Sequence, residues 1–226
     1  MALELSPRVG YIGTGWTERV QIPAFSLGGL TAQAVASGQL ANAERVAARF
    51  DIPEVHEDWR ALVASPNVDI VSICSPPHLH KEMAIAALEA GKHVICEKPM
   101  ALDTAEAEAM FAAAQAHPDQ LAIIDHEMRF HPIRLALRQM LREGEIGHLL
   151  RIDCTRVAGD RLNPDLPWTW WADAGKGGCM LGAIGSHLID LSRWLAGRIE
   201  SLTGQTQIAH FSRRDSTGAI RDVTAD

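Results

Sequence analysis

Two glycines near the N-terminus are spaced for phosphate binding. The first apolar run of the chain leads directly into the turn Gly13-Thr14-Gly15-Trp16. In a strand–turn–helix unit, the first glycine permits the tight turn and the second lets the backbone approach a pyrophosphate at the helix N-terminus. Glu18 replaces the third glycine of the G-x-G-x-x-G pattern, so the motif alone also fits a plain strand-to-helix turn. Its place in the first unit of an alternating series predicts that these four turn residues bind a dinucleotide.

The residues after the second predicted strand bear on which dinucleotide is bound. A carboxylate there would hydrogen-bond the ribose hydroxyls and repel a 2′-phosphate, but the chain reads Ser37-Gly38 and has no acid before Glu44. Ser37 can donate to a phosphate, Gly38 leaves room for it, and Arg45 can pair with it bidentately. Arg45 also fits a solvated position on its helix. The charge pattern favours NADP over NAD.

A third group that could do chemistry is Glu97-Lys98-Pro99, which follows the apolar run at residues 93–96. Ligands bind outside the carboxyl ends of strands in an open parallel sheet, so we expect Lys98 beside a nicotinamide or a substrate. An ammonium there can donate to a substrate oxygen and stabilise negative charge. Pro99 biases Lys98 toward an extended backbone. Taken alone, the motif better fits a surface lysine paired with Glu97.

These residues need a scaffold, and the first half of the chain predicts one. Short apolar runs alternate there with longer stretches rich in Ala, Glu and Leu, which is typical of buried parallel strands separated by helices. The predicted strands are 8–12, 31–36, 69–74, 93–96 and 121–124, and the predicted helices are 41–50, 80–90 and 104–116. The expected fold is a Rossmann-like, doubly wound α/β sheet.

A different pattern begins after Asp125. It predicts helices at 132–143 and 180–196, a strand with one exposed face at 149–157 and more sheet at 199–211. We therefore expect a dinucleotide-binding domain over residues 1–125 and an α+β substrate and oligomerisation domain over residues 126–226. A sheet of so few strands leaves an apolar face and an open edge, so the second domain is expected to be incomplete at its C-terminus. The full-length protein is expected to form a homo-oligomer.

Composition excludes several classes of protein. The 226 residues are 47% hydrophobic and 22% charged, as in ordinary globular proteins. The net charge of −7 argues against nucleic-acid binding. No apolar run could span a membrane and the N-terminus lacks the sections of a signal peptide, so a cytoplasmic location is expected. The cysteines contain no CxxC pair, which disfavours a disulfide framework, and no His/Cys/Asp cluster predicts a metal site.

Four segments together resemble the glucose–fructose oxidoreductase / inositol dehydrogenase / MocA (Gfo/Idh/MocA) family of nicotinamide-dependent oxidoreductases. Their order and spacing match over essentially the whole chain. The resemblance implies hydride transfer between NAD(P) and a small polyol, sugar, cyclitol or related carbonyl compound. The segments are Val9–Gly15, Asp69–His80, Gly91–Pro99 and Gly177–Asp190.

The resemblance also implies roles for individual residues. Lys98 corresponds to the catalytic lysine of the family, and the turn after the third predicted strand corresponds to a cofactor contact. The segment Gly177–Asp190 resembles the pattern GGGxLxDxGxHxxD, in which the histidine handles the proton together with the lysine. The match implies that His187 and Asp190 lie at the site. Ala183 stands where the pattern has its first aspartate. The residues implied to contact the cofactor from this comparison are Ser75, Pro76, His80 and Glu97.

Some alternatives stay open. His80 also fits a histidine satisfied at a helix start, and Asp190 could orient His187 or be structural. Arg129 could reach the site, although an ion pair is favoured. Three tryptophans could stack on a sugar or fill the space below the glycine-rich segment that precedes residue 180. They are Trp168, Trp170 and Trp171. The competing function is a cofactor-sensing regulator without chemistry, which the loss of the motif aspartate favours slightly.

Overall fold

The computed structural model describes residues 6–159 and 161–225. The chain divides into two compact units, Met1–Asp125 and His126–Asp226, and each is considered by itself. Within the described residues, no helix is both long and apolar enough to cross a membrane.

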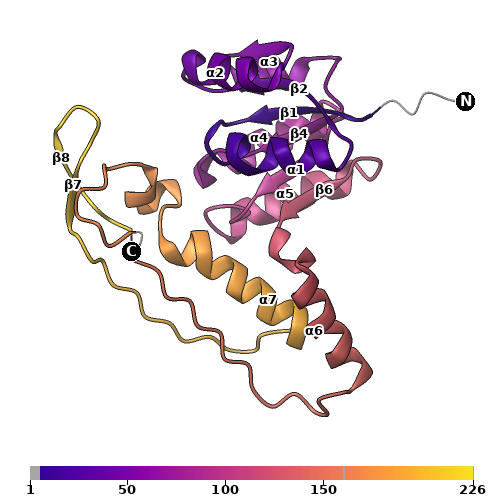
Figure 1. Cartoon of the computed structure of the whole chain (residues 1–226), viewed down its shortest axis with the longest axis vertical. Coiled ribbons are helices and arrows are strands. Elements are labelled where there is room, and N and C mark those ends of the chain that lie inside the picture. The colour runs from indigo at the N-terminus through magenta and orange to yellow at the C-terminus, as the bar shows by residue number, and fades with distance from the viewer. Residues whose placement is uncertain (1–5, 160, 226) are drawn as a thin grey trace, which may run out of the picture. The chain divides into compact units, whose positions relative to one another are not determined.

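A six-stranded sheet forms the centre of the first unit, and all its neighbouring strands are parallel (Figure 1). The strands are β1 (Arg8–Ile12), β2 (Thr31–Ala36), β3 (Glu54–His56), β4 (Ile70–Ile73), β5 (His93–Glu97) and β6 (Ala122–Asp125). Their order in the sheet is β3-β2-β1-β4-β5-β6. The order reverses between β1 and β4, and sheets of this kind bind ligands at the carboxyl edge beside that switch point. The predicted Rossmann-like fold is confirmed.

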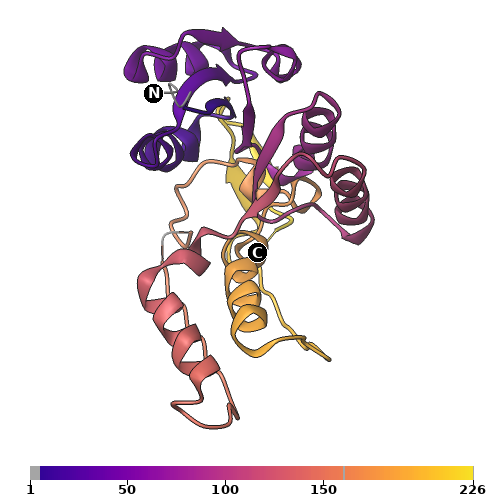
Figure 2. The same ribbon diagram turned by 90° about the vertical axis from the view of Figure 1, so that its right-hand side faces the viewer.

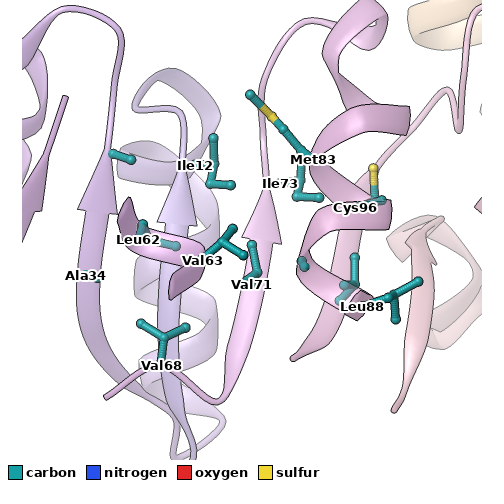
Figure 3. Packing of buried hydrophobic residues seen from close by; sticks show 14 of the residues in the cluster. Ile12, Ala34, Leu62, Val63, Val68, Val71, Ile73, Met83, Leu88 and Cys96 are labelled. Atoms are coloured by element: carbon teal, nitrogen blue, oxygen red, sulfur yellow. The ribbon is translucent and has the colours of Figure 1, made fainter. Parts of the chain in front are cut away.

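Helices cover both faces of this sheet, and each face has its own core. They are η1 (Thr17–Gln21), α1 (Ile22–Leu27), α2 (Leu40–Phe50), α3 (Trp59–Ala64), η2 (Pro77–Leu79), α4 (His80–Glu89) and α5 (Thr104–Ala116). Alternate residues of β1 point to opposite faces: Val9 and Tyr11 pack with α1 and α2, whereas Ile12 packs with α3, α4 and α5. Figure 3 shows the core that contains Ile12, in which Val63 of α3 lies near Val71 of β4.

β3 and α3 are among the short elements of the first unit that were not predicted. β3 has only three residues, too few for a recognisable alternation, and Pro53 precedes it. α3 has six residues, and its N-cap is Asp58, whose side chain accepts from the backbone N–H of Arg60. Elements this short are stabilised by their neighbours more than by their own sequence pattern.

Helices and one hairpin make up the regular structure of the second unit. Its elements are η3 (Glu127–Phe130), α6 (Pro132–Glu143), η4 (Trp170–Ala172), η5 (Ala174–Lys176), η6 (Leu181–Gly185), α7 (Ser186–Ala196), β7 (Ser212–Arg214) and β8 (Ile220–Asp222). α6 begins with Pro132 and ends at Gly144, which has a φ of +74°, as expected for these residues. α6 and α7 are drawn as separate coils in Figure 2 and are linked by Arg138, whose guanidinium lies 4.3 Å from the ring centroid of Trp194.

The strands predicted at 149–157 and 199–211 are wrong. Both segments are chain without regular secondary structure and carry no arrows in Figure 1; β7 begins only at Ser212. Leu150 and Val157 are 89% and 91% exposed. A strand needs a hydrogen-bonded neighbour, and within the described residues neither segment has a ladder partner. Alternating hydrophobicity was therefore not sufficient to predict sheet here.

Candidate cofactor and catalytic site

The glycine turn is crowded on one side and open on the other. Gly13 has a φ of +102°, and an added Cβ would lie 2.3 Å from the carbonyl oxygen of Cys74, so only glycine fits there. The Gly13 N–H donates to the carbonyl oxygen of Ala36 at 2.9 Å. At Gly15, no described atom lies within 4 Å of an added Cβ. A tight turn with open backbone at the start of a helix fits a pyrophosphate group.

Glu18, in the position of the missing third glycine, connects η1 to α2. Arg45 Nη1 donates to both carboxylate oxygens of Glu18 at 2.6 Å, and Arg49 Nη1 donates to one of them at 2.9 Å. The hydrogen bond from Arg45, followed by that from Arg49, lowers the pKa of Glu18. The side chain of Arg45 is still 53% exposed. Sequence analysis singled out Arg45 but missed the role of Glu18, because the contact depends on how two helices pack.

Ser37 and Gly38 follow β2 at the edge of the sheet where the glycine turn lies, since Ile12 and Ala36 are paired in the parallel register. No described atom lies within 4 Å of a Cβ added at Gly38. The Oγ of Ser37 accepts from the backbone N–H of Gln39 at 3.3 Å. The space expected beside this strand end is therefore present.

Lys98 directly follows Glu97, which belongs to a buried series of side-chain hydrogen bonds. Glu97 is only 7% exposed, and its carboxylate accepts from Nε2 of Gln21 at 3.0 Å. Ser72 Oγ in turn donates to Oε1 of Gln21 at 2.9 Å. This series joins η1, β4 and β5 immediately below the point where Lys98 leaves the sheet. The Lys98–Pro99 peptide is cis.

His80 connects the turn after β4 to the turn after β5. Its ring is 1% exposed; Nδ1 lies 2.9 Å from the carbonyl oxygen of Pro99 and Nε2 lies 2.9 Å from that of Ser75. Burial lowers the pKa of His80. His80 thus positions the backbone of both turns, whereas Ser75 and Pro76 form the first turn itself.

The second unit holds the predicted proton-transfer residue. His187 lies at the start of α7 and is 7% exposed. Its Nε2 is 3.8 Å from Oε1 of Glu127 on η3, and its ring meets that of His126 edge-on at a centroid distance of 5.9 Å. Ala183, at the position of the motif aspartate, is 6% exposed on η6. Glu127 was not singled out from the sequence, because only the packing of η3 against α7 brings it close.

Asp190 forms an ion pair with Arg129, for which the sequence favoured such a pair. Arg129 Nε donates to Asp190 at 2.7 Å, and a second guanidinium nitrogen donates to the other carboxylate oxygen. This bidentate hydrogen bonding raises the pKa of Arg129. His126 Nδ1 lies 3.8 Å from Asp190. The pair therefore joins η3 to α7, next to His187.

Trp171, one of the three tryptophans considered for a sugar pocket, lines a cavity. Trp171 borders a space of about 200 Å³ in the second unit, together with Arg213 and His210. Trp168 donates through Nε1 to the carbonyl oxygen of Asp222 at 2.9 Å, which fixes it against the hairpin. In the described part of the chain, no three His, Cys, Asp or Glu side chains are grouped so that they could hold a metal ion.

The sheet order and the glycine turn together are those of a dinucleotide-binding Rossmann domain. A family model described as an oxidoreductase family with an NAD-binding Rossmann fold matches residues 7–124, and a model of the GFO/IDH/MocA C-terminal domain matches residues 135–224. The chain belongs to the Gfo/Idh/MocA oxidoreductase family, as its motifs predicted.

Individual relatives agree with this assignment. An uncharacterized oxidoreductase of Synechocystis sp. is 38% identical over 96% of this chain and 59% of its own length. Levoglucosan dehydrogenase of Pseudarthrobacter phenanthrenivorans is 34% identical over 71% of this chain and 41% of its own length. A solved levoglucosan dehydrogenase in complex with NADH and L-sorbose matches 98% of this chain with a TM-score of 0.86 and 28% identity, over 62% of that chain. The chain thus spans at most about three-fifths of the length of these relatives.

Proposed function

We propose that this protein is an NAD(P)-dependent dehydrogenase or reductase acting on a CH–OH or carbonyl carbon of a small sugar, cyclitol or polyol. The observation that carries the proposal is the crowded but open glycine turn, at the same sheet edge as Lys98. Support also comes from levoglucosan dehydrogenase, whose complexes contain NADH with L-sorbose or levoglucosan. A cytoplasmic location and a homo-oligomeric state are part of this proposal.

Each candidate site residue would have a distinct task. When bound, the nicotinamide supplies hydride acceptance or donation. Backbone N–H groups of the Gly13–Trp16 turn would hold the pyrophosphate. Lys98 would donate to the reacting oxygen and stabilise its negative charge. His187 would take up or return the hydroxyl proton, which suits a group that titrates near neutrality, while Asp190 and Arg129 would hold α7 against η3.

We propose NADP as the preferred cofactor. The carboxyl end of β2 carries Ser37 and Gly38 and no carboxylate, and the half-exposed Arg45 could add a charge-assisted hydrogen bond to a 2′-phosphate. Glu18 works against this preference, because its carboxylate already accepts two short hydrogen bonds from Arg45. The preference for NADP is therefore expected to be limited by the Glu18–Arg45 pair.

The test is a cofactor-reduction assay with NAD⁺ and NADP⁺ across sugars, cyclitols and hydroxy acids. Turnover of a sugar or cyclitol would support the proposal. The competing function is a cofactor-sensing regulator, favoured by Ala183 at the position of the motif aspartate. Tight cofactor binding without turnover of any compound would support the regulator and contradict the proposal.

A further inference from the structure

The second unit surrounds His187 with a specific set of charged groups. Glu127 lies on η3, 3.8 Å from the His187 ring nitrogen Nε2, and the His126 ring meets that of His187 edge-on. Among the described residues, Arg129 and Asp190 add two further charges close to this place, and they pair with each other.

Asp190 is poorly suited to serve as the carboxylate partner of His187. Both of its oxygens accept hydrogen bonds from Arg129, so its negative charge is balanced by a guanidinium. The carboxylate of the family motif is also lacking, because position 183 is an alanine on the turn before His187. The carboxylate of Glu127, whose side chain is 44% exposed, approaches the His187 ring.

We propose that Glu127 is the positioning carboxylate of His187 and replaces, from a neighbouring helix, the aspartate that the chain lacks at Ala183. This inference rests on the proposed function. A carboxylate at this distance favours the imidazolium form and orients the ring. The distance of 3.8 Å between Glu127 and His187 exceeds that of a direct hydrogen bond. Glu127 therefore acts on His187 mainly through its negative charge, and a direct hydrogen bond would require the two side chains to move closer when a substrate binds.

The experiment titrates His187 directly. In protein labelled with ¹⁵N-histidine, the His187 signals are assigned by their loss in His187→Asn and then followed against pH. We expect Glu127→Gln to lower the pKa of His187 by about 0.5–1 unit, since an opposite charge is removed. Glu145→Gln, which removes an exposed carboxylate after the end of α6, is the matched control and should leave the titration unchanged.

A kinetic measurement complements the titration. For Glu127→Gln, the acidic limb of the kcat/KM profile should move to lower pH by the same amount as the His187 titration, and the double variant Glu127→Gln/Ala183→Asp should move it back. An unmoved His187 titration in Glu127→Gln would overturn the inference. The titration needs no turnover, so a shifted pKa in a protein inactive on every substrate would instead contradict the proposed function.

Discussion

The negative charges of three carboxylates, two in the first unit and one in the second, are balanced in different ways. Glu18 is held by two arginines at the surface, Asp190 by one arginine, and Glu97 by the amide of Gln21 in the interior. Removing a charge at the surface leaves a cation that water can solvate, whereas removing the Glu97 carboxylate would leave a buried amide without its acceptor. Substitutions at these acids therefore test different properties of the site.

Lys98→Met tests the catalytic assignment. The substitution keeps the aliphatic stem and removes the cation, so we expect hydride transfer to fall by about 10²–10³, as when one preorganised donor is lost. Cofactor binding should persist, because the glycine turn is unchanged. Single-turnover rates with saturating cofactor separate binding from chemistry. Lys81→Met on α4 is the control, and turnover of Lys98→Met at the parent rate would refute the assignment.

Arg45→Ala tests cofactor choice. If Arg45 contacts a 2′-phosphate, its loss should reduce the preference for NADPH by an amount on the order of 1.5–3 kcal/mol, as for a hydrogen bond to a charged group. Fluorescence titration with NADPH and NADH measures this preference. Arg49→Ala removes the other arginine that binds Glu18 and should leave the preference nearly unchanged. Tighter binding of NADH than NADPH by the unaltered protein would contradict the NADP proposal.

The placement of a site residue at the sheet edge could be predicted from the sequence where the motif is local in the chain. Gly13, Gly15 and Lys98 owe their expected placement to the strand that precedes each of them, and the structure puts all three at one sheet edge. Contacts such as Glu18–Arg45 and Glu127–His187 could not be predicted. They join distant parts of the chain, and no local pattern specifies which helices pack together.

At the level of elements, β3 is a short edge strand stabilised by one carboxylate. Glu54 on β3 accepts hydrogen bonds from Gln33 of β2 and from Ser65 and Asn67, which follow α3. Burial opposes its ionisation, but the hydrogen bonds from Asn67, Ser65 and Gln33 outweigh this effect and lower the pKa of Glu54 to about 2. Glu54 therefore compensates for the small number of residues in the strand.

Glu54→Gln should destabilise the first unit in a pH-dependent way. Because the pKa in the folded state is below the ordinary value, the stabilisation is complete above about pH 4.5 and is lost as the pH falls toward 2. We expect a loss on the order of 1–3 kcal/mol at pH 7 and a smaller one near pH 2.5, measured by urea unfolding. The exposed Glu57→Gln is the control. Equal losses at both pH values would show that the Glu54 charge is unimportant.

The sequence predicted long elements better than short or unpaired ones. Five of the six sheet strands have apolar runs long enough to recognise, and α4, α5 and α6 have helical lengths. β3 is too short to carry a pattern. The segment 149–157 has the right alternation but no strand beside it, and pairing is a property of two segments.

For the whole molecule, exposed apolar side chains are concentrated in the second unit. Six of them are more than two-thirds exposed: Phe130, Ile133, Leu150, Val157, Leu202 and Phe211. Apolar residues exposed in such numbers favour association. The second unit therefore presents surface that a partner copy or another chain could bury.

We expect the 226-residue chain to self-associate in a concentration-dependent manner. Replacing Leu150 and Val157 together by lysine should shift the population toward the monomer, because it removes apolar surface and adds like charges. Light scattering coupled to size-exclusion chromatography measures the mass. Leu27→Lys, at a site 92% exposed in the first unit, should have little effect. A monodisperse monomer at all concentrations, with cooperative unfolding, would contradict this expectation.

The division into two units has a consequence for spectroscopy. The only tyrosine, Tyr11, is buried in β1 of the first unit, whereas Trp168, Trp170, Trp171 and Trp194 belong to the second. The other tryptophans lie in the first unit, so tryptophan emission reports on both units and is weighted toward the second. A single midpoint of the emission change therefore need not describe a single unfolding transition. Burial raises the pKa of Tyr11, and tyrosinate absorbance in alkali consequently reports when the β1 core of the first unit opens to water.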